Sequence, residues 1–121
     1  MVNEKSFIEN ALEAFRKINN EIEKGATEHD IRYRFVKYFV EGFLGYEPQY
    51  IRWEKKRADL TILDENNFAV IKIETKRPTE NIDKIEYEEQ AFRYAEETTR
   101  FIGLTNFLRF KLWELKKLGE N

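Results

Sequence analysis

Three charged residues in the middle of the chain have the types and spacing that phosphodiester chemistry uses. They are Asp59, Glu74 and Lys76, in the segment KRADLTILDENNFAVIKIETKRP at 56–78. Two neighbouring carboxylates repel each other unless a cation neutralises them, and Mg²⁺ prefers oxygen ligands of this kind. A bound Mg²⁺ would polarise a phosphodiester, while an ammonium beside it offsets negative charge in the transition state. The pattern predicts a site for phosphodiester hydrolysis.

The two apolar runs around these charges predict a β-hairpin whose turn is DENN at 64–67. Side chains alternate between faces along a strand, so Glu74 and Lys76 should share one face. With the hairpin centred near Asn66, we expect Asp59 opposite Ile73 and within one residue of Glu74.

The rest of the chain predicts the order α-α-β-β-β-α-β-β, an α/β fold with a central mixed sheet. A capping box at Ser6 begins a first helix that ends at Gly25, and one at Thr27 begins a second that ends at Gly45. A third helix is expected over 83–98. The expected strands cover 49–53, 57–63, 68–75, 101–105 and 107–115.

Composition limits the class of protein. The chain has 121 residues, of which 41% are hydrophobic, enough for one domain with one core. It has no cysteine, which excludes disulfides and thiolate chemistry. No apolar run reaches the roughly 20 residues of a membrane span and no signal peptide is evident, so we expect a cytoplasmic protein without a membrane partner. The net charge of −2 implies that any nucleic-acid binding is local or assisted by metal.

Five segments, in order, resemble the PD-(D/E)xK nuclease superfamily, and more narrowly the nuclease domains of type I and type IIG restriction enzymes. The segments are TEHDIRYRFVKYFVEGFLGY, RADLTIL, IKIETKRP, QAFRYA and GLTNFLRFKLWEL, within 27–115. Ala58 stands where the superfamily name has proline, as in many restriction relatives. The resemblance implies a restriction-endonuclease-like, three-layer fold: a single nuclease domain over 1–121, with a helix at 1–25 before the core at 27–115.

The resemblance also implies a metal site. Asp59 and Glu74 would bind Mg²⁺, or Mn²⁺ in its place, and the Thr75 carbonyl would complete the site. Glu28 would add the acid that many family members supply from the preceding helix. An acid in the first turn of a helix also favours the helix dipole, so capping is an equal interpretation of Glu28.

Other residues would act around that metal. The resemblance gives Lys76 the role of assisting the attacking water and places Gln90 and Tyr94 along the site. Gln90 and Tyr94 are four residues apart and so are expected on one face of the third helix. A basic patch that would attract the phosphate backbone is formed by Lys55, Lys56, Arg57, Lys72, Lys76 and Arg77.

Simpler interpretations stand beside these. Glu74 and Lys76 could form an ion pair at a solvated strand end, Asp59 could be an acid near a turn, and the basic patch could be a solvated loop. Gln90 and Tyr94 could be partly buried helix residues.

The function expected on this basis is a Mg²⁺-dependent DNA endonuclease that leaves 5′-phosphate ends. Sequence specificity would come from a methyltransferase, helicase or specificity partner, from DNA structure, or be absent. One site cuts one strand, so a double-strand cut needs two chains, which a homodimer would supply. The alternatives are a structure-selective nuclease such as a Holliday junction resolvase and a DNA-binding or interaction module that keeps the fold without cleavage.

Overall fold

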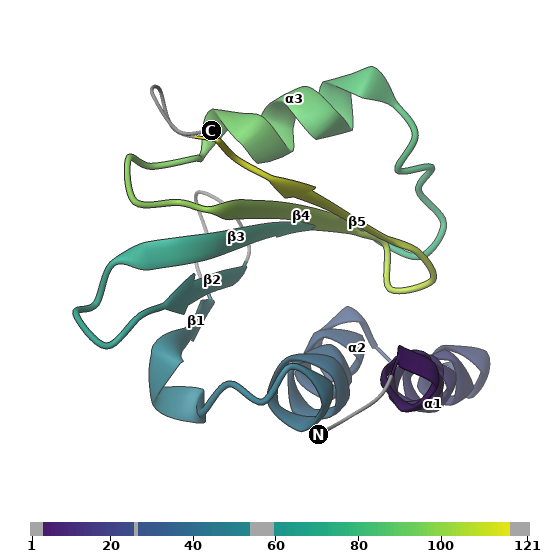
Figure 1. Ribbon diagram of the computed structural model, residues 1–121. Coiled ribbons are helices and arrows are strands. Elements are labelled where there is room, and N and C mark those ends of the chain that lie inside the picture. Colours follow the sequence, from purple (N-terminus) through teal and green to yellow (C-terminus); the bar gives the residue numbers. More distant parts are fainter. Residues whose placement is uncertain (1–3, 26, 54–59, 117–121) are drawn as a thin grey trace. The chain divides into compact units, whose positions relative to one another are not determined.

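The computed structural model describes residues 4–25, 27–53 and 60–116, with the side chains of residues 4–8, 28 and 29 outside the description. The chain divides into two compact units, Met1–Pro48 and Gln49–Asn121, called here the N-terminal and C-terminal units. The N-terminal unit is helical, and the C-terminal unit holds the sheet (Figure 1). The protein is therefore mixed α/β, as the sequence predicts.

The N-terminal unit is built from α1 (Glu4–Glu23), α2 (Glu28–Phe35) and a π-helix (Val36–Phe43) that continues α2. The Thr27 hydroxyl accepts a hydrogen bond from the Asp30 amide at 3.2 Å, which confirms the predicted cap of α2. The predicted cap at Ser6 is wrong, because α1 already begins two residues earlier.

Aromatic packing holds these helices together. The Phe15 ring of α1 lies 5.0 Å from the Phe39 ring in an edge-on arrangement, and Phe39 stacks on Phe35 at 5.2 Å. Ile18 and Val40 are fully buried in the same unit. Edge-on and offset aromatic pairs stabilise a core beyond their area burial. The helices of this unit thus have an apolar core of their own.

The C-terminal unit holds five strands in the order β1-β2-β3-β4-β5 (Figure 1). The β3–β4 pair is parallel, and the other three neighbouring pairs are antiparallel. A short 3₁₀ turn, Pro48–Tyr50, precedes the first strand. The strands are β1 (Ile51–Trp53), β2 (Leu60–Leu63), β3 (Ala69–Thr75), β4 (Phe101–Thr105) and β5 (Phe110–Glu114).

The β2–β3 hairpin turns at the predicted place. The Asp64 carboxylate accepts hydrogen bonds from the Asn66 and Phe68 amides, at 2.8 and 3.0 Å. The register differs from the expectation by one residue, because Leu60, rather than Asp59, marks the position opposite Ile73. A β-bulge at Leu63 causes the shift, since it adds one residue to β3 close to the turn.

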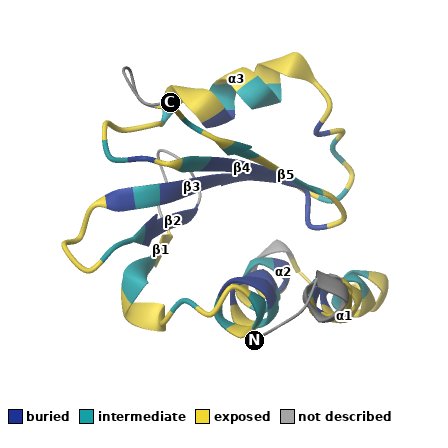
Figure 2. Ribbon diagram, in the orientation of Figure 1, coloured by how far each residue is buried: buried dark blue, intermediate teal, exposed yellow. Residues whose placement is uncertain are grey.

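One helix, α3 (Ile85–Arg93), covers the face of the sheet that carries Ile102 and Leu104. Ile82, Ala91, Ile102 and Leu104 form the buried cluster beneath it. Figure 2 shows β3 and β4 largely in the colour of buried residues. The helix is shorter than the predicted 83–98. Its end is set by the next loop, in which Thr98 donates to the Ala69 carbonyl at 3.0 Å. Tying this loop to the start of β3 prevents the helix from continuing.

Within the described residues, no helix combines the length and apolar character that a membrane span requires.

Candidate active site

The end of β3 and the residue that follows it bring together a carboxylate and an ammonium on the face covered by α3. Glu74 lies in the β3–β4 ladder opposite Leu104, a core residue under α3, and is only 5% exposed. Lys76 follows two residues later, and its Nζ atom lies 3.6 Å from Glu74 Oε1. Strand alternation places both side chains on one face, as the sequence predicts. The structure brings the two residues into contact.

The Lys76 ammonium is held by α3 as well as by Glu74. It donates a hydrogen bond to Gln90 Oε1 at 2.7 Å, and it lies 4.5 Å from the centre of the Tyr87 ring. A cation over an aromatic face is stabilised by the ring quadrupole. We call Glu74, Lys76, Tyr87 and Gln90 the Lys76 cluster. It is a preorganised ammonium beside a buried carboxylate.

Tyr87 is itself fixed by the loop that leads into α3. Its hydroxyl donates to Glu80 Oε2 at 2.8 Å, and this hydrogen bond is the main cause of a raised Tyr87 pKa. Glu80 also lies 3.8 Å from the Arg77 guanidinium. The ring that lies against Lys76 is therefore held at its far end.

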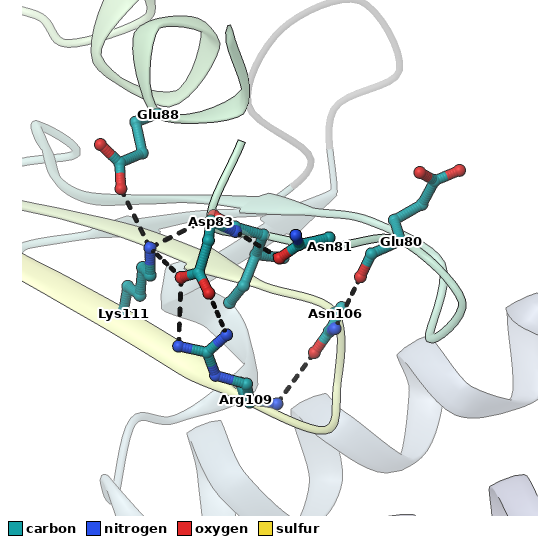
Figure 3. A network of polar contacts seen from close by, with 8 residues as sticks. Glu80, Asn81, Asp83, Glu88, Asn106, Arg109 and Lys111 are labelled. Atoms are coloured by element: carbon teal, nitrogen blue, oxygen red, sulfur yellow. Dashed lines mark hydrogen bonds and ion pairs between the residues drawn. The ribbon is translucent and has the colours of Figure 1, made fainter. Parts of the chain in front are cut away.

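A second polar network fixes the start of α3 against β5 (Figure 3). Asp83, just before the helix, binds Arg109 at 2.8 Å and Lys111 at 2.7 Å, and Lys111 also binds Glu88 at 3.0 Å. The hydrogen bond from Arg109, followed by that from Lys111, holds the Asp83 pKa well below its usual value. The pKa values of Arg109 and Lys111 are raised, mainly by the hydrogen bond to Asp83. This network fixes the helix that presents Gln90 and Tyr87.

The β4–β5 turn adjoins the Lys76 cluster. The Lys76 amide donates to the Thr105 carbonyl at 2.8 Å, and the Asn106 side chain donates to the Glu80 carbonyl at 2.9 Å. Phe107 in this turn has φ +71°, a conformation that is costly for a bulky residue. Hydrogen bonds around it, including one from its amide to Thr105 Oγ1 at 2.9 Å, hold that conformation. The backbone at Lys76 and at Glu80 is thus hydrogen-bonded to the β4–β5 turn.

Several predicted site residues lie outside this description. Asp59, Lys55, Lys56 and Arg57 lie outside the described residues. Glu28 is the first residue of α2, in the N-terminal unit, and its side chain is outside the description.

The other predicted residues lie near the end of β3 or at the end of α3. Thr75 is buried, and its side chain points to the face opposite Glu74. Arg77 is exposed and interacts with Glu80. Tyr94 is the C-cap of α3 rather than a residue inside it, and of the two expected helix residues it is Gln90 that contacts Lys76.

Lys72 corrects the predicted basic patch. Its side chain is 1% exposed, and its Nζ atom lies 2.7 Å from Glu96 Oε2 in the loop after α3. Lys72 is in mid-strand on the covered face, two residues before Glu74, so its charge is used inside the fold. It does not belong to an exposed basic surface.

The predicted metal site falls only partly on the described residues. They contain no group of three or more His, Cys, Asp and Glu side chains that could hold an ion. The Glu74 carboxylate is a hard oxygen ligand of the kind that suits Mg²⁺ or Mn²⁺. A metal site there would need a second carboxylate from elsewhere in the chain. Asp59 is the predicted donor.

Tyr87, Glu80 and the Asp83 network were not predicted from the sequence as parts of the site. In the sequence, Tyr87 is one of the regularly spaced apolar positions that predict the third helix. Its spacing of three residues from Gln90 was the available signal, because residues three apart are neighbours on a helix surface. The Asp83 network joins residues 83 and 109, and no local pattern connects them.

Comparison of the chain with family models, with curated proteins and with solved structures gives no match.

Proposed function

We propose that the chain is a metal-dependent DNA endonuclease of the PD-(D/E)xK type, with a restriction-endonuclease-like fold. The observation that supports this is the Lys76 cluster: an ammonium fixed at 2.7 Å by Gln90 and placed 3.6 Å from a buried carboxylate at a strand end. A solvated surface ion pair would leave both side chains exposed, whereas Glu74 is buried and Lys76 is 17% exposed. The cost of placing these charges here is consistent with a chemical role.

In this proposal Glu74 and Asp59 hold Mg²⁺, with the Thr75 carbonyl as a further ligand. The β2–β3 ladder pairs Leu60 with Ile73, so one more pair in the same register would join positions 59 and 74. Bound Mg²⁺ would stabilise negative charge on the phosphate and favour ionisation of water. Glu28 stays a candidate for an additional acid.

Lys76 would position the attacking water and offset charge that develops on the phosphate. Lysine has three N–H donors, and the cluster shows one of them donated to Gln90. The water oxygen would form a bond to phosphorus and give up a proton to solvent, while the bond to the 3′ oxygen breaks and that oxygen takes up a proton from solvent. The products are a 5′-phosphate and a 3′-hydroxyl.

A plasmid-nicking assay tests the proposal. Wild type with Mg²⁺ should convert supercoiled plasmid to the open-circular form, and EDTA should stop it. Glu74→Gln removes the ligand charge with little change in volume and should lower the rate 100-fold or more. Parallel assays on linear duplex and four-way junctions distinguish a restriction-type activity from a junction resolvase. If wild type leaves every DNA intact with both Mg²⁺ and Mn²⁺, the proposal is wrong.

A further inference from the structure

The N-terminal unit contains a pocket of about 370 Å³ whose walls come from α1 and the π-helix. Lys17 lines it from α1, and Lys37 and Tyr38 line it from the π-helix. Asn10 adds an amide, and Gly42 forms a wall without a side chain. Two lysines thus line a pocket that also has apolar walls from Ala14 and Phe43, and the pocket belongs to the N-terminal unit, whereas the Lys76 cluster belongs to the C-terminal unit.

Lys37 and Tyr38 of this pocket contact two further residues outside its lining, Tyr33 and Arg34. Lys17 lies 5.2 Å from the centre of the Tyr38 ring, and Arg34 lies 5.9 Å from it while donating to the Tyr38 hydroxyl at 3.2 Å. Arg34 and Lys37 also lie 5.8 and 5.9 Å from the centre of the Tyr33 ring. Tyr33 is 54% exposed. We call Lys17, Tyr33, Arg34, Lys37 and Tyr38 the basic–tyrosine cluster.

Among the described residues, no acid forms an ion pair with the positive charges of this cluster. Within the described parts of the chain, Lys17, Arg34 and Lys37 take part in cation–π contacts and the one hydrogen bond to Tyr38, and in no ion pair. Glu13 also lines the pocket, but its carboxylate is bound by Arg16 at 2.7 Å. In a chain of net charge −2, three cations are therefore gathered without a carboxylate partner from the part of the chain that the structure describes. A local positive potential of this kind attracts phosphate.

The π-helix contributes to the shape of the pocket. π-helical turns are rare and occur often at functional sites. A Cβ atom at Gly42 would lie 3.1 Å from the Lys37 carbonyl oxygen. Glycine at this position therefore avoids a tight contact inside the π-helix and leaves more space in the pocket that it lines. The π-helix is thus the segment that contributes Lys37, Tyr38 and Gly42 to the pocket.

We propose that the basic–tyrosine cluster binds a single-stranded segment of nucleic acid. A backbone phosphate would lie in the pocket between Lys17 and Lys37, with a base against the exposed Tyr33 ring. Cationic grooves with aromatic side chains are the usual means of binding single strands, because every base has a π-face. Three cations and two rings exceed what one free phosphate ion needs. This binding does not depend on the Lys76 cluster or on metal.

The test is fluorescence anisotropy with a labelled 20-nucleotide single-stranded DNA, titrated in EDTA at several salt concentrations. The double variant Lys17→Ala/Lys37→Ala should bind at least tenfold more weakly. Its plot of log affinity against log salt should lose about 0.7 from its slope, since the one phosphate contact that both lysines share contributes about 0.7. Tyr33→Ala should weaken binding about tenfold with the slope unchanged.

The controls separate this proposal from the nuclease. Lys24→Ala removes an exposed lysine of the same unit that does not line the pocket, and it should bind as wild type. Lys17→Arg/Lys37→Arg keeps the charge and should restore binding, which excludes misfolding as the cause of the loss. Because the titration is made in EDTA, its result does not depend on whether the chain cleaves DNA.

Three results would overturn the proposal. One is a double alanine variant that binds as tightly as Lys24→Ala. Another is tighter binding of the matching duplex than of the single strand. The third is displacement of the strand by inorganic phosphate at micromolar concentration, which would indicate a small-anion pocket.

Discussion

Two lysines on one face of β3 have opposite environments. Lys72 lies in β3, Lys76 directly follows the last residue of this strand, and both side chains are on the side of the sheet that α3 covers. Lys72 is 1% exposed and is bound by a carboxylate, Glu96, at 2.7 Å. Lys76 is bound at 2.7 Å by a neutral amide, Gln90, and its carboxylate neighbour Glu74 is farther away at 3.6 Å. Lys72 thus has a close carboxylate partner, whereas Lys76 has a close amide partner and a longer ion pair with Glu74.

The difference comes from where α3 ends. Beyond Arg93 the chain turns, and the Thr98 and Thr99 hydroxyls both donate to the Ala69 carbonyl, which brings this loop to the start of β3. Glu96 belongs to this loop and pairs with Lys72 in mid-strand. Lys76 is at the strand end and meets the helix itself. Two lysines with the same position in the strand pattern therefore serve stability in one case and, in our proposal, chemistry in the other.

The largest expected effect is on cleavage. Lys76→Met should lower plasmid nicking 100-fold or more, because it removes the positioned positive charge. Lys72→Met is the matched control. It removes the same charge with little change in volume and should keep nicking within about threefold of wild type. The comparison fails if the two variants lose activity equally.

The next effect is on stability. Glu96→Gln leaves the Lys72 ammonium buried without its counter-charge, which should lower the free energy of unfolding by roughly 2 to 3 kcal/mol. This is less than for a fully buried pair, because the Glu96 side chain is 49% exposed.

Gln90→Ala should cost about 1 kcal/mol, as for one ordinary hydrogen bond, but lower nicking about tenfold. Urea denaturation of both variants checks this, and an equal loss of stability in both would remove the distinction.

The smallest effect concerns the network of Asp83, Arg109 and Lys111, which holds the start of α3. The pKa of Asp83 is lowered by Arg109 and Lys111, so the native state favours its ionised form. Its contribution to stability is present above the ordinary aspartate pKa of about 3.9 and is lost as the pH falls further. Asp83→Asn should therefore flatten the fall in urea midpoint between about pH 4 and pH 2. Glu89→Gln, at an exposed position of α3, is the control. An Asp83→Asn profile identical to wild type would contradict this role.

Local patterns predicted much of the fold. Periodicity and turn residues gave the order of helices and strands, the cap at Thr27 and the turn at Asp64. They did not give the bulge at Leu63, because nothing in the residue types marks an extra residue in β3. They also extended the third helix too far, since its end depends on hydrogen bonds from residues 98 and 99 to residue 69.

Residue patterns alone predicted the candidate site only where its residues are close in sequence, whereas Gln90 was expected there from the resemblance. Glu74 and Lys76 follow from alternation along one strand. The burial of Lys72 does not, because it depends on the position of Glu96, 24 residues later. The contact between Tyr87 and Lys76 and the link from Asp83 to Arg109 and Lys111 also depend on tertiary packing. These are the interactions that distinguish a fixed ammonium from a solvated one.

The most direct test of the central claim is a crystal structure with Mn²⁺, located by its anomalous signal. We predict one ion within about 2.2 Å of oxygens from both Glu74 and Asp59, with the Lys76 ammonium beside it and still bound to Gln90. Carboxylates more than about 7 Å apart could not share one ion through bonds of about 2.1 Å. That separation, or a structure with no ion at Glu74, would contradict the proposed metal-dependent nuclease.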